Sequence, residues 1–169
     1  MPRFKKELEA ALPALWRYAF ALTRERTLAD DLVQDCLERA LRKRDLWDQA
    51  RPIQPWLARM ALNIHRNQFK SSARAQYVAY DEDMAGLQAA ASSEQELQAK
   101  DMLRRVDALP ADQREILLLV VIDGLSYAQA AEVLSIPVGT VMSRISRARA
   151  ALKQDPQVRA ARGRLRSVT

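Results

Sequence analysis

The polar side chains between residues 138 and 152 have the types and the spacing of a helix that reads double-stranded DNA. Short hydroxyl and guanidinium side chains recur on one side of such a helix: Thr140, Ser143, Arg144 and Arg147. An apolar stripe follows a second side at the same helical spacing: Val141, Ile145, Ala148 and Leu152. Hydroxyl groups and guanidinium forks hydrogen-bond base edges and phosphates in a major groove. The pattern therefore predicts a recognition helix.

The residues just before this helix predict the rest of a helix-turn-helix. Ser126 is a good N-cap, and Gln129 stands three residues later, where it completes a capping box. Gly124 suits the end of the preceding helix. Residues 135–137 read Ser-Ile-Pro, which ends one helix and starts the next. We expect two short helices joined by a tight turn over residues 126–152.

A second polar stripe, free of acids, follows a helical spacing earlier in the chain: Arg59, Asn63, Arg66, Asn67, Lys70 and Arg74. Asn63 and Asn67 lie one turn apart, and each amide offers a donor and an acceptor, as the edge of an unstacked base requires. Residues 49–80 contain no Asp or Glu, and residues 138–169 carry eight Lys or Arg against one acid. Two basic zones predict two polyanion contacts, although a solvated surface is the alternative for either zone alone.

An acidic stripe precedes these basic zones, at spacings of three, four and seven residues: Asp31, Gln34, Asp35 and Glu38. Such a stripe suits a basic protein partner. The alternative interpretation is a solvated helix face, on which acids near the N-terminus of the helix are stabilised by the helix dipole.

Apolar periodicity indicates the helices that must position these stripes. We expect helices over residues 4–23, from a cap at Thr27 or Asp30 to about 44, from about 55 to 74, over 94–109, and over 113–123 with Asp112 as cap. The second helix should bury Leu28, Leu32, Cys36 and Ala40. Trp56 shares its spacing with Leu57 and Met60, which favours a core position over a stacking platform.

Composition limits the function classes. The 169 residues are 49% hydrophobic with only four glycines and a net charge of +6, which favours packed helices. Long uncharged apolar runs and signal-peptide-like starts are absent from the sequence, so we expect no membrane insertion and a cytoplasmic location. One cysteine excludes an internal disulfide and a cysteine-rich metal site. We expect no metal, no cofactor and no enzyme activity, because no catalytic constellation is present.

The string ADDLVQDCLERAL, which follows LWRYAFALTRERTL, resembles the second conserved region of bacterial sigma-70 family sigma factors. In that family the acidic stripe docks on the clamp coiled coil of core RNA polymerase. The resemblance assigns Asp31, Gln34 and Asp35 to polar docking positions and Leu41 to an apolar one. It also implies that the next helix reads the −10 promoter element, with Asn63 and Asn67 at a flipped base.

The string LPADQREILLLVVIDGLSYAQAAEVLSIPVGTVMSRISRARAAL resembles the fourth sigma region. There the recognition helix reads the −35 element, while the preceding helices contact the polymerase flap. The positions that the resemblance places at the −35 duplex are Thr140, Met142, Ser143, Arg144, Ser146 and Arg147. Many relatives carry Arg at the position of Met142 and a bulky residue at that of Ser146, so the −35 sequence cannot be copied from a relative.

The resemblance covers residues 8–74 and 95–153 and fits the extracytoplasmic function (ECF) group, which keeps only these two regions. It implies an all-α fold with two small helical domains, a three-helix region 2 (1–75) and a helix-turn-helix region 4 (95–156). A flexible linker (76–94) and a basic tail (157–169) complete the chain. Expected partners are core RNA polymerase, promoter DNA and an anti-sigma factor.

Two other functions remain open at this point. A sigma-like mimic would sequester an anti-sigma factor and could lose its DNA-facing residues, whereas Asn63, Asn67, Arg144 and Arg147 are all present. An ordinary helix-turn-helix regulator would account for residues 126–152 but for neither the acidic stripe nor the asparagine pair. The acidic cluster at residues 81–83 is either a phosphate mimic inside the polymerase or part of a soluble linker.

Overall fold

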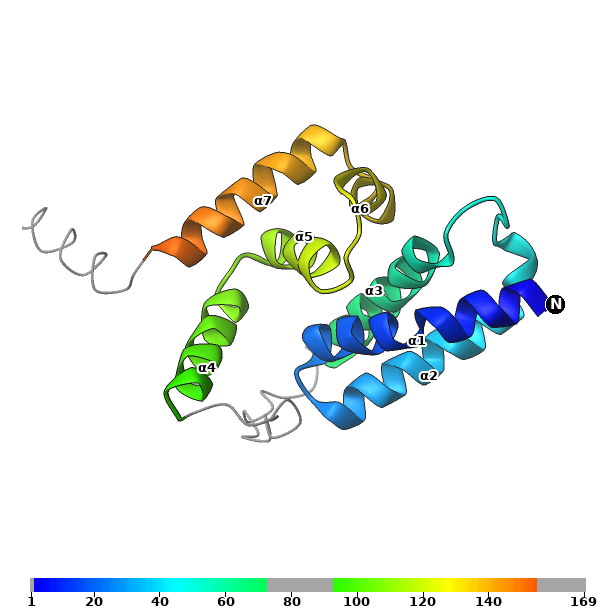
Figure 1. Cartoon of the computed structure of the whole chain (residues 1–169), viewed down its shortest axis with the longest axis horizontal. Helices are drawn as coiled ribbons and strands as arrows, with labels where there is room; N and C mark the ends of the chain where they lie inside the picture. The colour runs from blue at the N-terminus through cyan, green and yellow to red at the C-terminus, as the bar shows by residue number, and fades with distance from the viewer. Residues whose placement is uncertain (1, 73–92, 155–169) are drawn as a thin grey trace, which may run out of the picture.

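The computed structural model describes residues 2–72 and 93–154, and the regular elements within these ranges are helices. The α-helices, shown in Figure 1, are α1 (Pro2–Thr23), α2 (Arg26–Arg42), α3 (Ile53–Ser72), α4 (Ser93–Asp107), α5 (Ala111–Val121), α6 (Tyr127–Leu134) and α7 (Val138–Lys153). A short 3₁₀ helix, η1 (Arg44–Leu46), follows α2. The all-α expectation is thus confirmed, with helices close to the places that periodicity predicts.

Helices α1, α2 and α3 pack side by side into an N-terminal unit (Figure 1). Their facing stripes bury residues such as Leu15, Leu32 and Leu57, as the apolar spacing predicts. Trp56 is half-buried and meets Phe4 edge to face, with ring centroids 6.4 Å apart. Trp56 therefore packs against the core from a partly buried position, so the predicted core position is met only in part.

The start of α2 differs from the prediction. Its N-cap is Glu25, so Thr27 and Asp30 lie inside the helix and do not cap it. Arg24 adopts a left-handed conformation (φ 59°), which turns the chain sharply and lets the helix begin early. The Asp30 carboxylate instead accepts a 2.8 Å hydrogen bond from Trp16 Nε1. Leu28, expected in the core, is 48% exposed.

Helices α5, α6 and α7 form the second core, around Ile116, Leu119, Val141 and Ile145. The predicted capping box is present, because Ser126 Oγ accepts from the Gln129 backbone N–H while the Gln129 side chain accepts from that of Ser126.

The turns at both ends of α6 also follow the sequence signals, whereas the start of α5 does not. Gly124 has φ +73° and Ser135 is left-handed, so the chain turns where the sequence predicts. The N-cap of α5 is Pro110, and Asp112 lies in its first turn. The expected Asp112 cap is thus wrong.

The two halves pack against each other through α3 with α6 and α1 with α5 (Figure 1). Tyr18, Ala58 and Leu62 are at most 1% exposed, and the buried apolar residues of both halves form one continuous cluster. By helical spacing, Ala58 and Leu62 lie on a different side of α3 from Leu57 and Ile64, so α3 is covered on two sides. We call this packing of α1 and α3 against α5 and α6 the closed arrangement.

Most of the predicted linker and the whole predicted tail lie outside the described residues, as does the acidic cluster at 81–83. Among the helices that the structure describes, none is both long enough and apolar enough to span a membrane.

Candidate nucleic-acid and protein interfaces

The acidic stripe lies on α2, which packs against α1 and α3 and lies away from α5, α6 and α7 in Figure 1. Asp31, Gln34, Asp35 and Glu38 are all exposed, and Leu41 at the end of the stripe is 51% exposed. Gln34 Nε2 donates to Glu38 Oε1 (3.3 Å), and Gln68 Nε2 donates to Asp35 Oδ2 (3.0 Å). We call Asp31, Gln34, Asp35 and Leu41 the docking face: carboxylates beside one exposed leucine suit a basic, partly apolar partner.

The predicted amide pair lies on an open side of α3. Asn63 and Asn67 are both exposed, one turn apart. Lys70 belongs to the same helix, but its side chain is not described, and Arg74 lies outside the described residues. The structure therefore brings Asn63 and Asn67 together on one accessible strip.

The two arginines of that helix contact the C-terminal half. Arg59 is exposed and its Nη2 donates to Ser135 Oγ at 2.7 Å. Arg66 is half-buried, its Nε donates to Glu115 Oε1 at 2.9 Å, and its Nη2 donates to the second oxygen of the same carboxylate. This hydrogen bonding with Glu115 raises the pKa of Arg66 above its ordinary value. Sequence reasoning found both arginines but neither of these contacts.

On α7 the predicted side chains divide into two groups. Met142, Ser143, Ser146 and Arg147 are exposed, and Met142 is 53% exposed. Ser143 Oγ donates to the backbone carbonyl of Thr140, at 3.1 Å.

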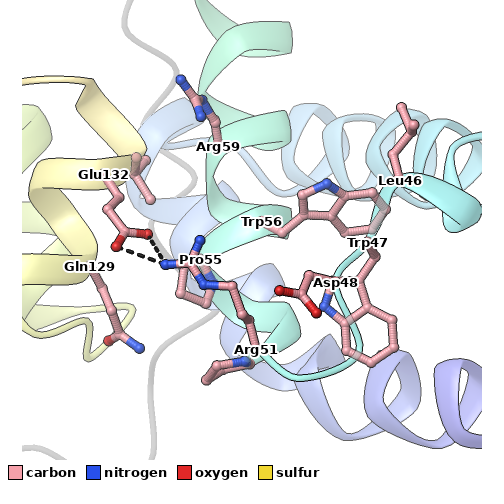
Figure 2. Close-up of a pocket in the computed structure, with 11 residues that line it drawn as sticks. Leu46, Trp47, Asp48, Arg51, Pro55, Trp56, Arg59, Gln129 and Glu132 are labelled. Carbon is pink, nitrogen blue, oxygen red and sulfur yellow. Dashed lines mark hydrogen bonds and ion pairs between the residues drawn. The ribbon is translucent and has the colours of Figure 1, made fainter.

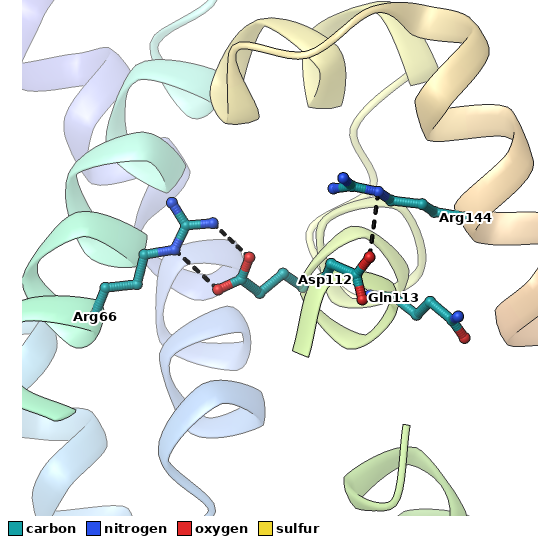
Figure 3. Close-up of polar contacts among 5 residues, drawn as sticks. Arg66, Asp112, Gln113 and Arg144 are labelled. Carbon is teal, nitrogen blue, oxygen red and sulfur yellow. Dashed lines mark hydrogen bonds and ion pairs between the residues drawn. The ribbon is translucent and has the colours of Figure 1, made fainter. Parts of the chain in front are cut away.

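Arg144 turns toward α5, where its Nε lies 3.4 Å from Asp112 Oδ2 (Figure 3). Its side chain is 28% exposed. The open surface of α7 thus presents a mixture of thioether, hydroxyl and guanidinium groups.

Buried polar groups that sequence reasoning missed lie where the halves meet. Asp123 is 5% exposed, and its Oδ1 accepts from Gln54 Nε2 at 3.1 Å; the same amide also donates to the Asp123 carbonyl. Burial raises the pKa of Asp123 to about 6, although the Gln54 hydrogen bond and the Arg17 charge act in the opposite direction.

Tyr18 faces the same region. Its hydroxyl is fully buried, and burial together with the charges of Asp123 and Glu115 raises its pKa. Asp123 ends the apolar run ILLLVVID, and an acid in that position is the one signal that could have marked it as buried.

The described residues contain no group of three or more His, Cys, Asp or Glu side chains that could hold a metal ion. The candidate sites described above are exposed faces of α2, α3 and α7.

Comparisons with known proteins found family models that match each half of the chain. The family described as "Sigma-70, region 4" matches residues 99–152, and the one described as "Sigma2 domain of PhyR" matches residues 8–61. The ECF RNA polymerase sigma factor EcfG of Rhodopseudomonas palustris is 33% identical over 148 residues, which cover 88% of this chain and 82% of the relative.

Solved structures are similar as well. The sigma factor RpoE, in complex with the anti-sigma factor NepR from Bartonella quintana, is 31% identical with a TM-score of 0.73, covering 90% of this chain and 96% of that chain. A superposition of this extent takes in both halves together. The anti-anti-sigma factor PhyR, complexed with NepR from the same organism, shares the fold at 15% identity (TM-score 0.56; 88% of this chain, 48% of that one). The chain belongs to the ECF group of sigma-70 family RNA polymerase sigma factors.

Proposed function

We propose that this chain binds core RNA polymerase through the docking face of α2 and delivers it to promoters. Asp31, Gln34 and Asp35 would contact the basic clamp coiled coil, and Leu41 would cover apolar surface beside it. The exposure of this face on the outer side of α2 carries the proposal, because a stand-alone DNA-binding regulator has no use for it. The polymerase performs the chemistry, in the cytoplasm, and this chain supplies only binding.

The two DNA contacts are divided between the domains, which we take as residues 1–75 and 95–156. Asn63 and Asn67, with Arg59, Arg66, Lys70 and Arg74, would hold the −10 element, since amides suit an unstacked base and guanidinium groups suit its phosphates. Met142, Ser143, Ser146 and Arg147 would face the −35 duplex, with Thr140 and Arg144 at its edge. Because one polymerase holds both domains, each DNA contact can be weak alone.

An anti-sigma factor is the expected regulator. RpoE of Bartonella quintana, which is similar to this chain over both halves, was solved in complex with the anti-sigma factor NepR. We infer that a comparable protein partner holds this chain in the closed arrangement.

The docking face can be tested by a titration of fluorescently labelled protein against core polymerase. The double variant Asp31→Lys/Asp35→Lys should weaken binding by about tenfold or more per reversed charge, because each carboxylate meets a basic surface. The control is Glu9→Lys/Glu94→Lys, which changes net charge equally at exposed positions on α1 and α4. Equal affinity of the two double variants, with helicity unchanged in both, would remove α2 from the polymerase contact.

A second candidate is a sigma-like mimic that captures an anti-sigma factor. The match of residues 8–61 to the sigma-like domain of PhyR favours it, since PhyR is named an anti-anti-sigma factor. That structural likeness is at 15% identity, whereas the likeness to EcfG is at 33% over 88% of the chain. Core polymerase binding separates the two, because a mimic needs only the anti-sigma factor.

A further inference from the structure

The open side of α7 carries an apolar side chain among its polar ones. Val141, Ile145 and Ala148 are buried, which leaves the opposite side of the helix exposed. Met142 lies at the edge of that open side and is 53% exposed. It is the one large apolar side chain among those assigned to the −35 duplex, so its contact with DNA must differ in kind from theirs.

Met142 lines a groove of about 360 Å³ between α6 and α7. Tyr127 of α6 lines the same groove, together with Ser146, Arg149 and Lys153 of α7. These three residues follow Met142 by four, seven and eleven positions, so they share its side of the helix. The described residues that line the groove include two cations and no acid, which suits a polyanion.

A second hollow, where the two halves meet, has the opposite character. Arg51 Nη2 donates there to both carboxylate oxygens of Glu132, at 2.8 and 2.7 Å (Figure 2). Asp48 lines this hollow as well. Its two carboxylates repel a phosphate backbone and its arginine already has an anionic partner, so the groove on α7 is the better site for DNA.

The polar side chains of α7 leave part of the base reading to other groups. Ser143 Oγ donates to the Thr140 carbonyl at 3.1 Å, so toward a base this hydroxyl can only accept. Arg144 Nε lies 3.4 Å from Asp112 Oδ2, and the Arg144 side chain is 28% exposed. Arg147 is therefore the guanidinium of the assigned set that stays exposed.

The apolar group that a base edge presents in the major groove is the C5-methyl group of thymine. An unbranched thioether side chain is flexible and polarisable, so it can adapt to such a methyl group. Met142 lies in the second turn of α7, and the N-terminal part of a recognition helix is the part that contacts base edges. Both the position and the chemistry of Met142 therefore suit a thymine.

We propose that Met142 reads the −35 element through the C5-methyl group of a thymine, while Arg149 and Lys153 bind phosphates beside it. Ser146 is short and exposed, so it leaves the thioether open to the base pair. The inference rests on the proposed −35 contact of α7 and adds the base that this contact selects.

The test compares thymine with uracil in the −35 element, because uracil lacks only the C5-methyl group. The probe is the promoter fragment with the strongest transcript that depends on this chain, synthesised with thymine or with uracil throughout its −35 element. Binding of both fragments to polymerase holoenzyme containing the full-length chain is measured by competition. Wild type should prefer the thymine fragment about fourfold, the factor expected for burial of one methyl group.

Two methionine variants provide the matched comparison. Met142→Ala should lose the preference for thymine, whereas Met102→Ala should keep it. Met102 lies on α4 and is 48% exposed, so both variants lose the same side chain from similarly exposed positions. Arg149→Ala should weaken binding of both fragments equally, since a phosphate contact does not identify the base. The same thymine preference in both methionine variants, or a −35 element without A·T pairs, would overturn the inference.

A scrambled −35 element separates failure of this inference from failure of the proposed function. If scrambling weakens binding by wild type while uracil has no effect, α7 reads the element without the methyl contact and only this inference falls. If scrambling has no effect, or if no transcript depends on the chain, the −35 contact of α7 is wrong and the inference falls with it.

Discussion

Asp123→Asn should make the free energy of unfolding less dependent on pH. The reason is that the buried Asp123 carboxyl, where the two halves meet, has a pKa well above the usual range of an aspartate. The pKa of Asp123 is about 6 in the folded chain against 3.8 for an unperturbed group. The difference of about 2 pH units corresponds to about 3 kcal/mol of folding free energy. Asp123 is 5% exposed, so little of this effect is screened by solvent.

The direction of this pH dependence follows from the pH at which the folded and the unfolded chain each bind the proton. Below about pH 3.8 the carboxyl is protonated both folded and unfolded, and its contribution to stability is fully present. As pH rises toward 6, the unfolded chain ionises first, so the folded chain progressively loses that stability. Asparagine stays neutral and keeps an oxygen that can accept from Gln54. The variant should therefore match wild type near pH 4 and exceed it by up to about 3 kcal/mol near pH 7.

The assay is urea denaturation followed by circular dichroism at 222 nm, which reports helices of both halves, at steps between pH 4 and 7.5. The quantity of interest is the free energy of unfolding of Asp123→Asn minus that of wild type, since shared groups such as His65 cancel in it. Asp45→Asn, at a side chain that is 90% exposed, is the matched control. A difference that stays flat, or falls as pH rises, would refute the assignment of Asp123 as a buried acid.

Two further outcomes are expected. Ser126→Ala should lower the free energy of unfolding by about 1 kcal/mol, because it removes the N-cap oxygen that accepts from the Gln129 backbone N–H. Ser126→Gly should lower it by less. An unchanged midpoint of urea denaturation in Ser126→Ala would show that the capping box contributes nothing to stability. Asn67→Ala should impair promoter opening more than polymerase binding, since Asn67 is exposed beside Asn63; equal permanganate reactivity of wild-type and variant open complexes would contradict this.

Local signals predicted the helix-turn-helix well. Ser126, Gln129, Gly124 and Ser135 act through hydrogen bonds and backbone conformations within a few residues of themselves, so their effect is readable from the sequence. The start of α2 escaped prediction because Arg24 adopts a left-handed turn that no nearby glycine announces.

The closed arrangement was not predictable in the same way. Glu115 lies 49 residues from Arg66, and Ser135 lies 76 residues from Arg59, so no periodic pattern connects them. One signal was nevertheless present: Ala58 and Leu62 place apolar residues on a second side of α3, which is typical of a helix covered on two sides.

The positions of the candidate DNA-facing residues were predictable only in part. Helical spacing placed Asn63 and Asn67 together, and both are exposed as expected. The same spacing could not tell that Arg144 turns toward Asp112, because that contact depends on how α7 crosses α5.

The most direct test of the central claim is run-off transcription with purified core polymerase, this chain and fragmented DNA of the source genome. The proposed function predicts discrete transcripts that appear only with the chain present and share elements near −10 and −35. Omission of the chain, or its replacement by Asp31→Lys/Asp35→Lys, should remove them. Binding of an anti-sigma factor with no binding to core polymerase and no transcript would contradict the claim and identify the chain as a mimic.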